Sequence, residues 1–133
     1  MNIYNIDDKD FVSSDLYKKF LSDNPAIGFL KIRAFAASQA VPISGLKVEI
    51  SRDIEGNKVI FFEGVTNVSG VIERISLPTK RASSDNMMAP NFVVYDITTN
   101  YNGEVRTYKV NIYDDIYVVQ NINVTPNISY GVS

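Results

Sequence analysis

From residue 28 onward, apolar and polar residues alternate with a period of two, the pattern of a β-strand with one buried face. The clearest run is residues 46–52, whose apolar members occupy every second position. We expect Leu46, Val48 and Ile50 to point into a core. The charged residues between them, together with Arg52, are expected to face mostly water.

Short runs of this kind, separated by turn residues, predict an all-β fold, an antiparallel β-sandwich of about seven strands. The pair Asn102-Gly103 is a strong signal for a tight hairpin turn. The expected strands are residues 29–35, 46–52, 58–63, 71–78, 92–98, 104–112 and 117–124.

A different period precedes the strands and predicts one short N-terminal helix. Ser13 or Ser14 can cap its first turn, and Asn24-Pro25 stops it, since a residue before proline resists the α conformation. The apolar stripe is too narrow to be stable in isolation, so the helix must dock on its own sandwich or on a partner. That stripe contains Leu16, Tyr17, Phe20 and Leu21.

The chain therefore divides into an N-terminal arm with the helix (residues 1–25), a sandwich domain (residues 26–126) and a short tail expected to fray (residues 127–133). Residues 79–91 break the alternation with a long polar stretch. Loops of this length in a compact domain are usually functional or mobile.

The composition narrows the chemistry. The 133 residues include no histidine and no cysteine, which removes the commonest general base and all thiolate chemistry. We therefore expect no enzymatic activity, no cofactor and no metal. A net charge of −2, with scattered basic residues, also makes nucleic acid a poor partner.

The first residues have neither the basic nor the apolar region of a signal peptide, and no apolar run approaches the length of a bilayer span. We expect synthesis in the cytoplasm and no membrane partner. A final location at a spore or virion surface would require another route, such as cell lysis or spore assembly.

Several turns and strands follow one another in an order seen in a known family. The segments are Gly28-Phe29-Leu30-Lys31-Ile32, Pro42-Ile43-Ser44-Gly45, Val48-Glu49-Ile50, Thr66-Asn67-Val68-Ser69-Gly70 and Leu77-Pro78. This order resembles the transthyretin-like (prealbumin-like) sandwich of carboxypeptidase regulatory-like domains. It is most similar to the N-terminal region of clostridial spore cortex-lytic enzymes. The resemblance implies the fold over residues 27–126; lytic activity is not implied, because no hydrolase domain follows.

Some surface adhesins with a similar sandwich form a Lys–Asn isopeptide bond beside a buried carboxylate. Here Lys31, with Asn121 or Asn123, would take those roles, and Asp96 would supply the carboxylate. The alternation places Lys31 and Asp96 on the solvated side, where an ammonium stays charged and is not nucleophilic. We therefore expect no such bond.

Acidic residues offer two further readings, a calcium site and a pair of catalytic carboxylates. Neither is favoured, because the EF-hand spacing is absent and no two carboxylates share one strand face near an apolar cleft. Solvated acidic turns are the simpler interpretation. The calcium candidates are Asp7, Asp8, Asp10, Asp114 and Asp115.

Candidate contact residues lie in the arm, the long loop and the C-terminal strands. The arm can add to a neighbour's sheet edge or pack on its own subunit. Adjacent methionines in the loop and the tyrosines near the end of the chain are typical of interfaces. The predicted interface residues are Ile3, Tyr4, Ile6, Leu16, Tyr17, Phe20, Met87, Met88, Tyr113 and Tyr117.

These observations favour a structural protein that assembles through protein–protein contacts, as a homo-oligomer or larger assembly in a bacterial spore layer or phage particle. A monomeric module that binds a cell-wall polysaccharide is the alternative. An accessory or pro-domain-like partner of a peptidoglycan hydrolase is less favoured.

Overall fold

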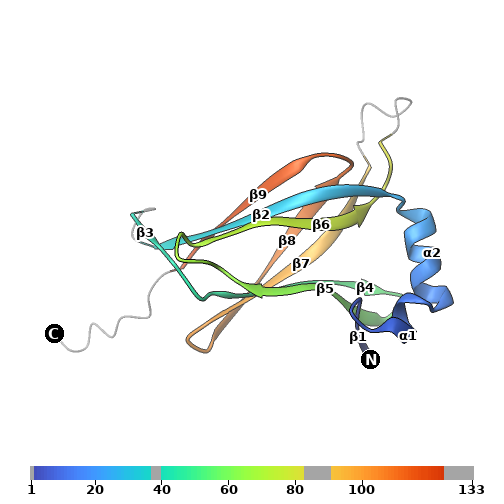
Figure 1. Cartoon of the computed structure of the whole chain (residues 1–133), viewed down its shortest axis with the longest axis horizontal. Helices are drawn as coiled ribbons and strands as arrows, with labels where there is room; N and C mark the ends of the chain where they lie inside the picture. The colour runs from blue at the N-terminus through green and yellow to red at the C-terminus, as the bar shows by residue number, and fades with distance from the viewer. Residues whose placement is uncertain (1, 37–39, 83–90, 125–133) are drawn as a thin grey trace.

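The computed structural model describes residues 2–36, 40–82 and 91–124 and forms a two-layered β-sandwich with helices at one end (Figure 1). In chain order the elements are β1 (Ile3–Asn5), α1 (Lys9–Val12), α2 (Asp15–Asp23), β2 (Ala26–Ala36), β3 (Val41–Pro42), β4 (Lys47–Ile54), β5 (Asn57–Val65), β6 (Val71–Thr79), β7 (Phe92–Tyr101), β8 (Glu104–Tyr113) and β9 (Tyr117–Asn123).

One sheet has the order β1-β5-β4-β7-β8, and the other has the order β3-β2-β6 with β9 also paired to β2. The sandwich prediction is confirmed, and the described residues form nine strands in place of about seven. The fully antiparallel arrangement is wrong in two places, because β1 runs parallel to β5 and β9 runs parallel to β2. Both parallel partners come from distant parts of the chain, so no hairpin turn signals them.

The alternation predicted for β4 is confirmed for Leu46, Val48 and Ile50, all of which are buried. The outward placement of Arg52 is wrong. Arg52 continues the same row and lies opposite the fully buried Val59 of β5. Its Nη1 donates to the Val94 carbonyl at 2.7 Å, so the guanidinium satisfies a backbone acceptor at the end of the core.

The predicted turns are also present. Asn102 and Gly103 have φ values of 52° and 85° between β7 and β8, as a hairpin turn with two left-handed residues requires.

The helix prediction holds for α2, where the Ser14 hydroxyl accepts from the Tyr17 amide at 3.3 Å and Asn24 follows the last helical residue.

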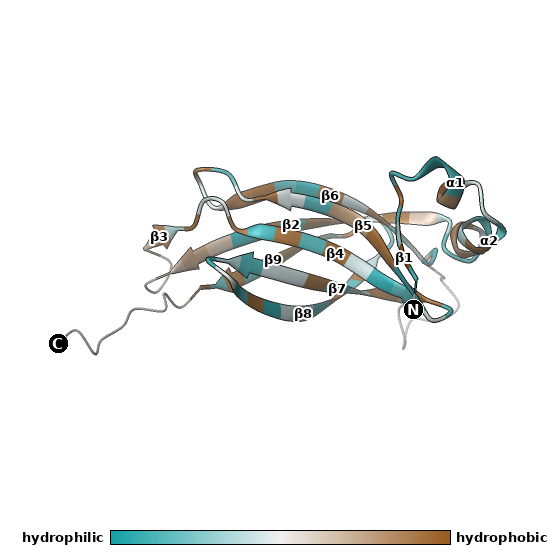
Figure 2. Cartoon of the chain, turned by 90° about the horizontal axis from the view of Figure 1, so that it is seen from below, coloured by the Kyte–Doolittle hydropathy of each residue, from teal (hydrophilic) through white to brown (hydrophobic). Residues whose placement is uncertain are grey.

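The arm packs against the chain's own sandwich. Figure 2 shows α1 and α2 at the same end of the two sheets, and β1 extends the larger sheet through β5. Phe11, Tyr17 and Phe20 are buried in the shared core. Phe61 of β5 joins them, with ring centroids 6.2 Å from Tyr17 and 5.7 Å from Phe20. These contacts give the short helices the docking surface that they need.

Tyr95 of β7 makes the core sensitive to alkaline pH. Its ring is fully buried, its hydroxyl donates to the Pro78 carbonyl at 2.5 Å, and burial raises its pKa well above the ordinary value. The folded state therefore keeps Tyr95 neutral when the unfolded chain begins to ionise. Stability from this group is present below pH 10, about the pKa of an unfolded tyrosine, and is lost as the pH rises further.

We expect Tyr95→Phe to flatten the loss of stability above about pH 10. At neutral pH the same variant should lose about 1 kcal/mol, because the hydrogen bond to Pro78 is gone. Urea unfolding at a series of pH values measures both effects. Parallel pH profiles for the variant and the unaltered protein would contradict the assignment.

Candidate functional site

The outer face of the smaller sheet carries the clearest surface feature of the described residues. Along β2, every second residue from Gly28 to Ala36 is buried, and the residues between them point away from the core. The outward row therefore begins with an aliphatic and an aromatic side chain and continues with two cations. It consists of Ile27, Phe29, Lys31, Arg33 and Phe35.

Phe29 lies at the centre of an aromatic and basic cluster on this face. The Arg74 guanidinium carbon lies 4.1 Å from the centroid of the Phe29 ring, within cation–π range. On the other side the Tyr117 ring lies 6.2 Å from Phe29, with an angle of 29° between the planes. The cluster spans β6, β2 and β9, so three strands hold it.

Polar contacts fix the edge of this cluster. The Tyr117 hydroxyl donates to the Glu73 carbonyl, and the Lys31 ammonium lies 3.6 Å from the Glu73 carboxylate. The ring of Tyr117 is therefore oriented across the sheet and does not swing freely in solvent.

Apolar side chains surround the cluster and remain accessible. Exposed fractions are 49% for Ile27, 47% for Tyr117 and 47% for Val119. Neighbouring exposed apolar residues on one sheet face are a common mark of an interaction surface. We call this surface the β2 face, defined by Ile27, Phe29, Lys31, Arg74, Tyr117 and Val119.

An open strand edge borders the β2 face. Within the described residues, β9 pairs with β2 and with no strand on its other side. Such an edge presents backbone donors and acceptors to a neighbouring chain. The β2 face thus combines exposed side chains with an unpaired strand.

The predicted interface residues of the arm differ in how far they are buried. Ile3 is 63% exposed, whereas Tyr4 stacks on Phe11 with ring centroids 4.8 Å apart. Ile6 and Leu16 are half-buried against the core. The hypothesis that Tyr17 and Phe20 contact another chain needs correction, because both rings are buried in their own core, each 7% exposed. Helix docking in cis is the physical reason.

The remaining predicted residues are scattered. Tyr117 belongs to the β2 face, while Tyr113 is half-buried and packs beside Phe92 at a centroid distance of 5.5 Å. Met87 and Met88 lie outside the described residues. Sequence reasoning missed Phe29 and Arg74, although the alternation already placed Phe29 on the same side as Lys31.

The acidic and basic candidates for chemistry are solvated. Lys31 pairs with Glu73 across the strands, and the Lys109 ammonium lies 2.6 Å from the Asp96 carboxylate. The Asp114 carboxylate accepts from the Ala82 amide at 2.9 Å. These contacts agree with the outward placement of Lys31 and Asp96.

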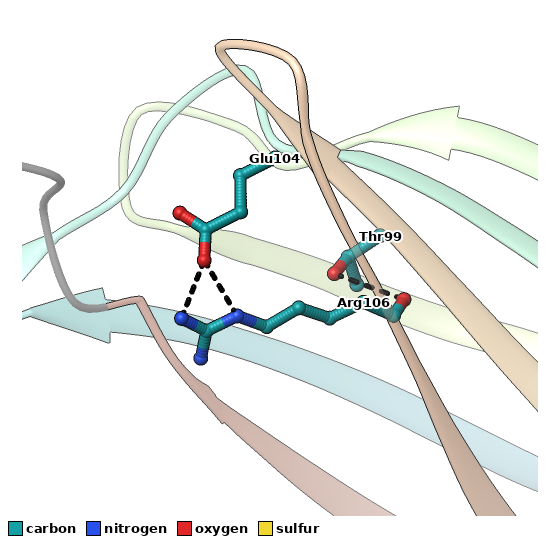
Figure 3. A network of polar contacts seen from close by, with 3 residues as sticks. All are labelled: Thr99, Glu104 and Arg106. Atoms are coloured by element: carbon teal, nitrogen blue, oxygen red, sulfur yellow. Dashed lines mark hydrogen bonds and ion pairs between the residues drawn. The ribbon is translucent and has the colours of Figure 1, made fainter.

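The described residues contain no group of three or more His, Cys, Asp or Glu side chains placed to hold a metal ion. One polar network joins β7 and β8 (Figure 3). On β8, Arg106 donates to the Glu104 carboxylate through Nε at 2.9 Å and Nη2 at 2.5 Å. From β7, the Thr99 hydroxyl donates to the Arg106 carbonyl at 3.5 Å. The hydrogen bond to Glu104 raises the pKa of Arg106, whose side chain is in solvent. Arg106 and Glu104 therefore form an ion pair in which each side chain stabilises the charge of the other.

Within the part of the chain that the structure describes, no helix has the length and apolar character needed to cross a bilayer.

Comparison with known proteins gives the fold. No family model and no curated protein matches the sequence. Among solved structures, Klebsiella pneumoniae 5-hydroxyisourate hydrolase matches at a TM-score of 0.50 and 18% identity, over 74% of this chain and 85% of that one. The fold is transthyretin-like.

Two more solved structures match this chain. (S)-allantoin synthase matches at a TM-score of 0.52 and 15% identity, over 82% of this chain and 45% of that one. Transthyretin from Sparus aurata matches at 0.43 and 12% identity, over 71% and 90%. At these identities the likeness concerns the fold and carries no activity to this chain. None of these three structures is a spore cortex-lytic enzyme.

Proposed function

We propose that this chain is a non-enzymatic structural protein that self-associates through the β2 face. The observation that supports the proposal is the half-exposed apolar side chains around the Phe29–Tyr117 pair, next to the open edge of β9. Removing such side chains from water is the main favourable term in protein association. The lack of histidine and cysteine supports a role without catalysis.

The charges of the β2 face suit a second copy of the same face. Glu73 of β6 stands next to Arg74 of the same strand and to Lys31 of the neighbouring β2, so the surface presents both signs. In a two-fold interface each copy supplies the same patch, and opposite charges can then meet across the axis. A homo-oligomer, or a larger assembly in a spore layer or phage particle, is the setting that we propose.

Val119→Lys tests the proposal. Val119 is 47% exposed on β9, the edge strand of the β2 face, so lysine is accommodated in the monomer but leaves a charge in the interface. We expect self-association to weaken by about tenfold or more, measured by sedimentation velocity over a concentration series.

Val105→Lys is the matched control, because Val105 is 59% exposed on β8 of the other sheet. It should leave the oligomer unchanged. A chain that stays monomeric at high concentration, or one that is disrupted by Val105→Lys and not by Val119→Lys, would contradict self-association through the β2 face.

The same surface suggests a second candidate, a monomeric module that binds a cell-wall polysaccharide. Tyr117 offers a ring with an anchored hydroxyl, and such rings stack on sugars. In that case the protein is monomeric and pellets with purified cell wall, and Tyr117→Ala abolishes the pelleting. An accessory partner of a peptidoglycan hydrolase is the form of this second candidate that the sequence resemblance alone suggests.

A further inference from the structure

A second site lies at the helical end of the sandwich, away from the β2 face. A cavity of about 360 Å³ opens between the end of α2, the β4–β5 turn and the start of β7. Its lining is divided evenly between apolar residues and residues with a charged or amide side chain. The lining residues used below are Asn24, Arg52, Ile54, Glu55, Lys80 and Phe92.

Two buried polar atoms on this wall have no hydrogen-bond partner among residues 2–36, 40–82 and 91–124. Asn24 is 6% exposed; its Nδ2 donates to the Phe20 carbonyl at 2.8 Å, and its Oδ1 accepts from nothing. Because Nδ2 faces a carbonyl, exchanging the two amide atoms would lose that bond. Arg52 donates from Nη1 to Val94, and its Nε is also unpartnered. Buried polar atoms are almost always satisfied, so this pair calls for a partner.

Arg52 also has no carboxylate partner within 4.0 Å among the described residues. Its guanidinium carbon lies 6.0 Å from the Phe20 ring centroid, so one side is apolar. Lys80 adds a second positive charge to the wall, and Asp23 and Glu55 add two negative charges. A cavity with both signs complements a ligand that carries an anionic group and a hydrogen-bond donor.

We propose that this cavity binds a small carboxylate with an adjacent N–H or O–H donor and a short apolar body, as in an α-amino or α-hydroxy acid. The carboxylate accepts from Arg52 and Lys80, and the adjacent donor bonds to Asn24 Oδ1. The apolar body lies against Ile54 and Phe92. Both unpartnered atoms are shielded from water in this structure, so binding in this way requires the Asn24 and Arg52 side chains to reorient toward the cavity.

The experiment compares four probes that share one isobutyl group by NMR titration of the isotope-labelled protein. L-leucine and 2-hydroxy-4-methylpentanoate carry both functions, while 4-methylpentanoate lacks the donor and 3-methylbutylamine lacks the carboxylate. We expect at least one bifunctional probe to bind about tenfold or more tightly than both monofunctional ones, because a site built around buried polar groups rejects a ligand that leaves them unpaired. The preferred bifunctional probe identifies the donor as amine or hydroxyl.

Arg52→Gln tests the assignment of the carboxylate. Glutamine retains a donor for Val94 but removes the positive charge, so the fold is preserved and affinity for the bifunctional probe should fall about tenfold or more. Arg33→Gln, at an exposed site on the outer face of β2, should leave affinity unchanged. Dispersion of the amide spectrum verifies that each variant is folded.

Three results would overturn the proposal. They are equal affinity for bifunctional and monofunctional probes, unchanged affinity in folded Arg52→Gln, and no saturable binding up to about 10 mM. The proposal is independent of self-association, because Val119→Lys changes the β2 face and leaves this cavity intact.

Discussion

Replacing Gly28 with alanine is expected to lower the free energy of unfolding by about 3 kcal/mol, enough to unfold a substantial part of the protein at moderate temperature. A Cβ at this position would lie 2.3 Å from the Tyr113 carbonyl oxygen and 2.5 Å from Ile112 Cγ2. Gly28 faces the core from β2, and Tyr113 ends β8 of the opposite sheet. Relief requires the two sheets to move apart, because a backbone atom cannot rotate away as a side chain can.

Gly45→Ala supplies the control. Gly45 has a φ of +80°, yet nothing lies within 4 Å of a Cβ built there. Its cost is therefore the left-handed backbone alone, about 1–2 kcal/mol. Urea unfolding curves of the two variants separate close approach from backbone conformation. A smaller loss for Gly28→Ala than for Gly45→Ala would show that the sheets adjust at this point.

Phe61→Ala should be as damaging, with a loss of about 3–5 kcal/mol. Phe61 is 6% exposed and contacts Tyr17 and Phe20 of the arm, and its ring stands edge-on to Tyr95 at a centroid distance of 5.1 Å. Removing it leaves a cavity between α2 and β5. We expect the amides of α2 to lose protection from hydrogen exchange before those of the central strands.

The neighbouring Phe62 provides a matched comparison, because it is only partly buried. Phe62→Ala should cost less and leave exchange in α2 close to that of the unaltered protein. Equal exchange in α2 for both variants would mean that the arm docks independently of Phe61.

Much of the fold follows from local patterns. The alternation in β4 and the turn at Asn102-Gly103 are short-range features, because each is decided by side-chain parity or by the φ preference of two residues. The cap at Ser14 is of the same kind. Such features are encoded within a few residues and can be predicted without knowing which strands pair.

Other features depend on distant partners. The parallel pairing of β2 with β9 joins residues about ninety positions apart, and no local signal encodes it. Arg52 shows a different failure: its position in the alternation indicated the core, and its charge suggested water. The alternation predicted the placement of Arg52 correctly and the charge did not. The side chain can point inward because the Val94 carbonyl at the end of the core accepts a hydrogen bond from the guanidinium.

The candidate sites were only partly predictable for the same reason. Tyr117 was anticipated, but its companions Phe29 and Arg74 come from β2 and β6, and only the sheet register brings the three together. The cavity at Asn24 and Arg52 is lined by the end of α2 and by two strands of the larger sheet, β4 and β7. Neither set of residues has a regular spacing in the sequence that a motif could describe.

The side-by-side run of β2 and β9 has a mechanical consequence. Seven aligned residue pairs join the first long strand to the last one, and both strands run in the same direction. Tension applied between the start of β2 and the end of β9 pulls the two strands lengthwise past each other. The hydrogen bonds between them then share the load and must fail together, unlike those of a hairpin pulled open from its ends, which yield one after another. A chain built this way is suited to bearing force along its length.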